Sequence, residues 1–151
     1  MEMFVVLPAA PDMLAQMAQL EQLCFSDPWS EESLSCALQS PCGLWLCAYS
    51  GGCLAGTLGA QVLEPEAEIL SVGVHPDFRR RGIARMLLMQ FFTRCAGVEH
   101  VYLEVRRSNL AAQALYAAFG FSPCGIRKSY YEHPAEDAIL MSWTRPEEEP
   151  C

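Results

Sequence analysis

The first 70 residues of the chain contain no lysine and no arginine, although they carry nine aspartates and glutamates. The other nine acidic residues and all ten basic residues lie in residues 71–151, so the net charge of −8 is the sum of −9 and +1. A chain this acidic lacks the basic surface that general nucleic-acid binding needs, and we expect no nucleic-acid partner. The acidic half suits a cationic partner, although acidic residues also serve simply to keep a protein soluble.

Long apolar runs, export signals and metal-binding patterns are also missing. No stretch is long enough to cross a bilayer, and MEMFVVLPAA has neither the basic start nor the apolar length of a signal peptide. We therefore expect a cytoplasmic protein with no membrane partner. The eight cysteines include no Cys-x-x-Cys pair, and the three histidines lack zinc-site spacing. This predicts no metal site and no disulfide framework, with the cysteines mostly buried as free thiols.

A length of 151 residues, with 52% hydrophobic and 19% charged residues, is typical of one globular domain. We predict a single domain over residues 1–145 and a flexible acidic tail over residues 146–151. Hydrophobic periodicity predicts the element order β-α-α-β-β-β-α-β-α-β-β, an α/β structure with a mixed sheet. Local signals place a helix N-cap at Ser30, a hairpin turn at Gly51-Gly52 and a helix end at Gly120.

Four of the ten basic residues gather between Arg79 and Arg85, in the segment SVGVHPDFRRRGIAR. A strand is predicted to end near Val74 and a helix to begin at Gly82, so the amides of the first helical turn lack intrahelical acceptors. Those amides and the helix dipole attract an anion, and a glycine lets it approach the backbone closely. The segment has neither a Walker Gly-Lys-Ser/Thr nor the glycine triplet of a dinucleotide site. We interpret it as a pyrophosphate cradle, while an arginine-rich turn taken alone is more often ordinary solvated surface.

Three polar residues in the segment LEVRRSNLAAQALY support a site beside this turn. Strand alternation places Glu104 on the face opposite the apolar residues of HVYLEV, and the next helix carries Asn109 and Tyr116 two turns apart on one side. In this interpretation the three side chains point toward one cleft. Each also has an ordinary structural role open to it: Glu104 as the partner of Arg106, Asn109 as an N-cap and Tyr116 as a core aromatic.

With these motifs, the segment Glu68–Trp143 resembles the core of the GNAT superfamily of acetyl-coenzyme A-dependent N-acetyltransferases. The superfamily pattern Arg/Gln-x-x-Gly-x-Gly/Ala is present as RRRGIA, from Arg79 to Ala84, and LYAAFGF resembles its second signature. More narrowly, the chain resembles the RimI-type ribosomal-protein-alanine N-acetyltransferases. Four matches in family order carry this resemblance: DPWSEES, LEVRRSNLAAQALYAAFGF, IRKSYY and EDAILM.

The resemblance implies a fold and a co-substrate. The fold is α/β (α+β), a single GNAT domain whose mixed, mostly antiparallel central sheet is flanked by helices, and the co-substrate is acetyl-CoA, with no metal. The backbone of Val72, Gly73 and Val74 is implied to hold the acetyl-pantetheine arm. Further cofactor contacts are implied for Asn109, Tyr116 and the arginine–glycine turn, namely Arg79, Arg80, Arg81, Gly82, Ile83, Ala84 and Arg85.

The resemblance also implies the chemistry. Glu104 would be the general base and Tyr116 the general acid, with direct attack in a ternary complex. The implied acceptor is the N-terminal α-amine of a protein, the alanine of a small-subunit ribosomal protein. The peptide site is implied at Trp29, Tyr130, Tyr131 and Glu136.

The sequence leaves alternatives to this reaction open. The acceptor could be another amine, such as a lysine side chain or a small metabolite, and the chain could be a non-catalytic acyl-CoA-binding module. A two-step mechanism with Cys124 as nucleophile is a further alternative, although no histidine occupies an obvious partnering position. The chain departs from the family in three places: Arg79 replaces a common glutamine, Ala84 replaces a common glycine, and CFSDPWS is longer than usual.

Overall fold

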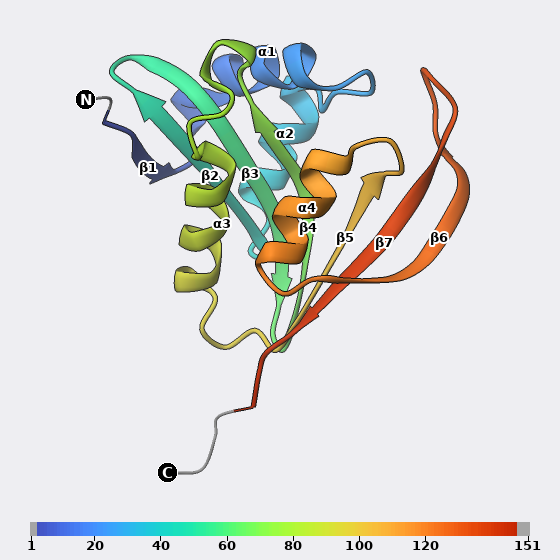
Figure 1. Cartoon of the computed structure of the whole chain (residues 1–151). Helices are drawn as coiled ribbons and strands as arrows, with labels where there is room; N and C mark the ends of the chain where they lie inside the picture. The colour runs from blue at the N-terminus through green and yellow to red at the C-terminus, as the bar shows by residue number, and fades with distance from the viewer. Residues whose placement is uncertain (1–2, 148–151) are drawn as a thin grey trace. The chain divides into compact units, whose positions relative to one another are not determined.

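The structure of the protein is a computed structural model that describes residues 3–147 (Figure 1). The chain forms two compact units. The first comprises the chain up to Val62 together with Ile69–Ala96, and the second comprises Leu63–Glu68 together with the chain from Gly97 onward. None of the helices within the described residues is long and apolar enough to span a membrane. The single domain over residues 1–145 stays a prediction, and residues 148–151 of the expected tail lie outside the described part.

The first unit contains strands in the order β1-β2-β3-β4. Their bounds are Val5–Pro8, Gly43–Ser50, Cys53–Leu63 and Glu66–Val74, of which Leu63 and Glu66–Glu68 are counted with the second unit. β1 pairs with β2, and β2 with β3, in antiparallel fashion. The predicted hairpin is confirmed, because Ser50 lies opposite Cys53 and Gly51 has a φ of +60°, which glycine adopts without strain.

Helices cover both faces of these strands. The helices α1, α2 and α3 span Leu14–Cys24, Glu31–Gln39 and Ile83–Arg94, with 3-10 turns at Pro11–Met13 and Pro76–Phe78. A Cβ at Gly56 of β3 would meet Ile83 and Leu87 of α3, whereas a Cβ at Gly59 would collide with the ring of Trp45. Because side chains alternate along a strand, α3 covers one face and the Trp45 side faces α1 and α2 (Figure 1).

The start of α2 follows its sequence signal, since Ser30 Oγ accepts a hydrogen bond from the Ser33 amide at 3.0 Å. The helices α1 and α2 then bury a cluster of side chains against the strands. Its buried members are Met17, Leu20, Leu34, Trp45, Cys47 and Leu54. Each fully buried leucine or methionine contributes about 1.5–3 kcal/mol, so this cluster holds α1 and α2 on the strands.

The second unit contains strands in the order β5-β7-β6, together with helix α4. The bounds are His100–Arg106 for β5, Leu110–Ala118 for α4, Ser122–Tyr131 for β6 and Glu136–Thr144 for β7. β7 pairs with β5 and with β6, both antiparallel. As predicted, alternation in β5 buries the apolar residues Val101, Leu103 and Val105 and leaves Glu104 on the other face. α4 ends as predicted, because Gly120 has a φ of +99°.

The cysteines differ from the sequence prediction. The seven described ones are free thiols, but only Cys47 and Cys95 are buried. Cys24 and Cys42 are half-buried, and three cysteines are exposed: Cys36, Cys53 and Cys124. The exposed ones lie on α2, beside the hairpin turn and on β6, at positions that face solvent.

Candidate active site

The arginine–glycine turn is exposed at the start of α3, in the first unit. Gly82 is the N-cap, and the Met86 amide donates to the Gly82 carbonyl at 3.0 Å, the first bond of the helix. Helix geometry therefore provides no intrahelical acceptor for the amides that precede Met86. A Cβ at Gly82 would meet no atom within 4 Å, so the space in front of the turn is open. The backbone of the turn is therefore accessible, and anion binding by the predicted cradle stays a prediction.

Two residues with a left-handed backbone shape the turn. Gly82 has a φ of +77° and Arg80 has a φ of +64°, a conformation that costs a non-glycine residue roughly 1 kcal/mol or more. Such turns can direct successive N–H groups toward one anion. The Arg81 guanidinium lies 5.3 Å from the centre of the Phe78 ring, so positive charge stays near the opening. Backbone donors, an open approach and basic side chains fit the diphosphate of acetyl-CoA.

The end of β4 leads into this turn and is overlaid by α1. A Cβ at Gly73 would lie 3.2 Å from the Phe25 ring and 3.3 Å from Cys24 Sγ, so the end of α1 packs closely on β4 here. The Val74 carbonyl accepts hydrogen bonds from Cys24 Sγ at 3.3 Å and from Arg79 Nε at 3.4 Å. The side chain of Arg79 therefore folds back onto β4. The predicted backbone contacts of Val72, Gly73 and Val74 with acetyl-pantetheine stay predictions.

Glu104 lies at the centre of a side-chain cluster in the second unit. Its Oε1 is 3.3 Å from Arg127 Nε, and the Tyr130 hydroxyl donates a hydrogen bond to the same carboxylate. Arg106, the partner considered from the sequence, forms an ion pair at 3.3 Å with Glu136. The side chain of Glu104 is 19% exposed, so solvent or a substrate can reach the carboxylate.

The strand register explains why Glu104 meets Arg127. Glu104 of β5 lies opposite Leu140 of β7, and Leu140 lies opposite Gly125 of β6. Arg127 is two residues along β6 from Gly125 and therefore on the same face of the strands. The two charged side chains reach each other across β7 as a diagonal pair.

Two neighbouring tyrosines lie beside Glu104 because β6 is irregular. The register of β6 shifts between Arg127 and Tyr131, and Ser129 within this stretch has a φ of +52°. The rings of Tyr130 and Tyr131 consequently meet edge to face, with centroids 5.1 Å apart, instead of pointing to opposite faces. The hydrogen bond to Glu104 and burial raise the pKa of Tyr130, and burial followed by the charge of Glu104 raises the pKa of Tyr131 to about 12. Both phenols are protonated at neutral pH.

Tyr116 belongs to the same cluster through Tyr131. It is buried on α4, and its ring packs edge to face on Phe121 with centroids 5.7 Å apart. Burial, followed by the interaction with Tyr131, raises the pKa of Tyr116 well above its usual value. Tyr131 also interacts with the charge of Glu104. Tyr131 thus interacts with both predicted catalytic residues, Glu104 and Tyr116, and the phenol of Tyr116 is protonated at neutral pH. That Glu104 and Tyr116 act together stays a prediction.

Two predicted binding residues have structural partners within the second unit. Asn109 Oδ1 accepts from the Ala112 amide at 3.1 Å, which makes Asn109 the N-cap of α4. Glu136 Oε2 accepts from the Ser108 amide at 2.6 Å, while Oε1 pairs with Arg106. Hydrogen bonds from Ser108 and the charge of Arg106 hold the pKa of Glu136 below its usual range. The contacts of Asn109 with the cofactor and of Glu136 with a peptide stay predictions.

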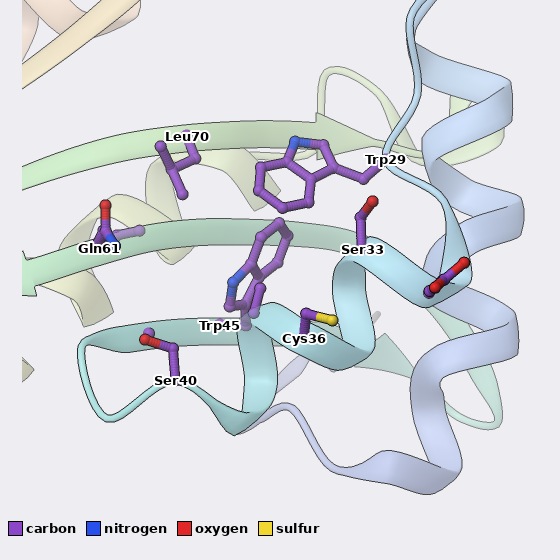
Figure 2. Close-up of a pocket in the computed structure, with 11 residues that line it drawn as sticks. Trp29, Ser33, Cys36, Ser40, Trp45, Gln61 and Leu70 are labelled. Carbon is purple, nitrogen blue, oxygen red and sulfur yellow. The ribbon is translucent and has the colours of Figure 1, made fainter.

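Trp29, the remaining predicted peptide residue, lies in the first unit. Its ring packs edge to face on Trp45, with centroids 5.3 Å apart (Figure 2). The amide of Trp29 interacts with Glu21, a carboxylate on α1 that is only 2% exposed. Glu21 Oε1 also accepts from Ser71 Oγ of β4 at 2.8 Å, and burial raises the pKa of Glu21. This buried carboxylate connects α1, β4 and the segment before α2.

Sequence reasoning missed the partners of the predicted residues. Arg127 belongs to the motif IRKSYY, and a basic residue so close to two tyrosines is the sequence feature that could have identified it as a partner. Nothing in the local sequence distinguished Glu21 from the exposed acidic residues around it. Within residues 3–147, no group of three or more histidine, cysteine, aspartate or glutamate side chains is arranged to hold a metal ion.

Comparison with known proteins identifies related chains over most of this length. The model of the Acetyltransferase (GNAT) family matches residues 14–121. The ribosomal protein bS18-alanine N-acetyltransferase of Salmonella typhimurium is 39% identical over 128 residues, which are 82% of this chain and 86% of that protein. The N-alpha-acetyltransferase RimI of Mycobacterium tuberculosis is 39% identical over 130 residues, 82% of each protein.

A solved structure has the same fold. The crystal structure of the ribosomal-protein-S18-alanine N-acetyltransferase from Escherichia coli superimposes with a TM-score of 0.88 at 33% sequence identity, covering 94% of each chain. This similarity confirms the fold class that the sequence predicted.

Proposed function

Since this chain belongs to the GNAT family of acetyltransferases, we propose that it transfers the acetyl group of acetyl-CoA to the α-amine at the N-terminus of a protein. N-acetyltransferase activity is a property of the family. The acceptor that we propose is the N-terminal alanine of a small-subunit ribosomal protein, which is supported by the names of the Salmonella and Escherichia coli relatives. A cytoplasmic location is part of the proposal.

The observation that carries this proposal is the set of contacts around Glu104, with Arg127 at 3.3 Å, the Tyr130 hydroxyl on the carboxylate and Tyr131 packed on Tyr130. Acetyl transfer requires a neutral amine, and a peptide α-amine has a pKa of about 7.7–8.0, so a modest pull on its proton suffices. Glu104, partly exposed and held by Arg127, accepts that proton directly or through one water.

Tyr116 supplies the acid in this proposal. Acetyl-CoA, when bound, provides the acetyl group as a thioester, so a sulfur departs and needs a proton. The raised pKa keeps the Tyr116 hydroxyl protonated at the pH of the reaction, which is the state that a proton donor requires. The transfer is direct, in a ternary complex, and the exposed thiol of Cys124 takes no part.

The first unit supplies the cofactor half of the proposal. The amides from Arg80 to Arg85 at the start of α3 would hold the diphosphate, because they combine backbone donors with the positive end of the helix dipole. Arg79 would contribute charge near the turn rather than a direct contact, since its Nε is bonded to the Val74 carbonyl. The peptide residues in this proposal are Trp29, Tyr130, Tyr131 and Glu136.

A panel of acceptors tests the proposal. The protein is incubated with acetyl-CoA and with peptides that begin with alanine or methionine, with an N-terminally blocked peptide that contains one lysine, and with a small polyamine. Products are identified by mass spectrometry, and free thiol is followed in parallel. We expect acetylation of the alanine α-amine with the highest kcat/KM. Preference for lysine or the polyamine would replace the proposed acceptor, and no transfer to any amine would support an acyl-CoA-binding module.

A further inference from the structure

The first unit contains a pocket whose lining includes no residue of the arginine–glycine turn. It is bounded by α2, the segment before α2, and strands β2, β3 and β4 (Figure 2). Its volume is about 580 Å³, which falls in the range of pockets that hold small ligands or large side chains. The chemistry proposed above leaves this pocket without an assigned role, apart from its Trp29 wall.

Two tryptophans form the aromatic wall of the pocket. Trp29 and Trp45 meet at an interplanar angle of 72°, and Figure 2 shows both rings turned toward the space between the helix and the strands. Trp45 fits there because Gly59 has no side chain, since a Cβ at Gly59 would collide with its ring. The indole N–H of Trp45 is buried and has no hydrogen-bond partner among the described residues.

The charge of the pocket has one sign. Glu32 is the charged residue in its lining, and no lysine or arginine lines it. The face of a tryptophan attracts a cation, most strongly when the cation is a guanidinium that can stack on the ring. A pocket with Trp29 in its wall and Glu32 as its charged lining residue therefore favours an arginine or lysine side chain over a neutral or acidic one.

The position of the pocket along β4 limits which residue of an acceptor could reach it. Leu70 of β4 lines the pocket, and the same strand ends at Val74, the last of the three residues whose backbone is implied to hold the acetyl-pantetheine arm. Four residues of extended strand span roughly 13 Å, and an extended peptide covers the same distance in four residues. The contacts of Glu21 with Ser71 and with the Trp29 amide hold the pocket wall to this strand.

We propose that this pocket binds an arginine or lysine side chain of the acceptor, about four residues downstream of the amine that is acetylated. The inference rests on the proposed function, because it assumes a peptide acceptor. It adds a specificity site that recognises the acceptor by charge, separately from the site of the α-amine.

An arginine scan tests this site. Peptides that begin with alanine and are otherwise neutral carry one arginine at each position from two to seven, and matched peptides carry citrulline, which keeps the shape without the charge. Steady-state kinetics are measured for the wild type, for Glu32→Gln, and for Glu31→Gln as the control, since Glu31 precedes it on α2 and does not line the pocket. We expect arginine near position five to lower KM about three- to tenfold relative to citrulline, with kcat unchanged.

The variants separate this inference from the function on which it rests. Glu32→Gln should remove most of the advantage of arginine over citrulline, whereas Glu31→Gln should retain it, and Trp29→Leu should weaken binding of both peptides. Equal KM values for arginine and citrulline at every position, or equal effects of the two glutamine variants, would overturn the inference while leaving acetylation intact. Failure of every peptide to be acetylated would instead overturn the proposed function.

Discussion

Glu21 in the first unit contacts neutral groups, whereas three acidic side chains in the second unit pair with arginines. In the first unit, Glu21 is almost completely buried and contacts neutral groups, the Ser71 hydroxyl and the Trp29 amide. In the second unit, three acidic side chains lie within 3.5 Å of an arginine nitrogen: Glu104 with Arg127, Glu136 with Arg106, and Asp137 with Arg107. No basic residue precedes Arg79, so Glu21 has no basic residue near it along the chain, whereas the second-unit carboxylates have arginines in neighbouring strands and loops.

This contrast indicates where acid–base chemistry can occur. Burial raises the pKa of Glu21, so this side chain gains little by being charged and serves to join α1 to β4. Hydrogen bonds from Ser108 and the charge of Arg106 lower the pKa of Glu136, so that carboxylate keeps its charge. A lowered pKa makes Glu136 a weak base, whereas the side chain of Glu104 is partly exposed beside Arg127 in the same unit. We therefore look for the base in the second unit.

The largest effect is expected for Glu104→Gln, which replaces the side chain that contacts Arg127 and Tyr130 and that we propose as the base. General bases contribute about 10²- to 10⁴-fold to a rate, so kcat/KM for the peptide should fall by a factor in this range at pH 7. The deficit should shrink above pH about 8, where the α-amine is already neutral. The measurement is the pH profile of kcat/KM for wild type and variant. A deficit that stays constant with pH would mean that Glu104 only positions the substrate.

A smaller loss is expected for Tyr116→Phe, which removes a hydroxyl from the second unit without altering its charges. The kcat should fall by roughly 10²-fold, because the leaving sulfur loses its proton donor, while the affinity for acetyl-CoA is retained. The kcat comes from steady-state kinetics, and the affinity comes from calorimetric titration with coenzyme A. Full turnover in Tyr116→Phe would remove Tyr116 from the mechanism and leave it as a core aromatic packed on Phe121.

The third prediction tests whether Glu136, a carboxylate already paired with Arg106, also contacts the peptide substrate. Glu136→Gln should raise KM for the peptide about three- to tenfold and leave KM for acetyl-CoA unchanged. Asp137→Asn is the matched control, because Asp137 also pairs with an arginine and also accepts a backbone amide, that of Ser129. Both variants should lower the melting temperature slightly, and only Glu136→Gln should alter the KM for peptide. An equal loss toward both substrates would make Glu136 a structural residue.

The sequence predicted those parts of the fold that are determined by residues close to one another in the chain. The cap at Ser30, the hairpin at Gly51 and the helix end at Gly120 are each decided within a few positions of the chain. Strand alternation likewise predicted which face of β5 is apolar, because that face only needs to meet a core. The burial of cysteines was predicted wrongly, since composition does not say which positions of α2 or β6 face the core.

The parts of the site that sequence could not predict depend on distant residues. Glu104 and Tyr116 were predicted from their motifs, but the pairing of Glu104 with Arg127 requires the register of three strands. Whether two adjacent tyrosines share a face depends on the irregular backbone at Ser129. The contact between Glu21 and Ser71 joins residues 50 positions apart, and no local pattern encodes it.

The smallest effect, and the sharpest test of the contrast between units, is expected for Glu21→Gln. Because burial raises the folded-state pKa of Glu21 above the unfolded value of about 4.3, the folded protein retains a proton that the unfolded chain releases. The stability of the wild type relative to Glu21→Gln should therefore be greatest below pH about 4.3 and fall as pH rises through the folded pKa, by at most about 1.4 kcal/mol per pH unit.

Urea unfolding of both proteins at a series of pH values measures this difference, and the titrations shared by the two proteins cancel. Ser71→Ala sharpens the test, because the Ser71 hydroxyl donates to Glu21 and lowers the pKa of its carboxyl, so its loss should extend the fall to higher pH. A difference between wild type and Glu21→Gln that does not change with pH would show that Glu21 is charged in the fold. The first unit would then stabilise a buried carboxylate without a cation, and the contrast with the arginine-paired carboxylates of the second unit would no longer hold.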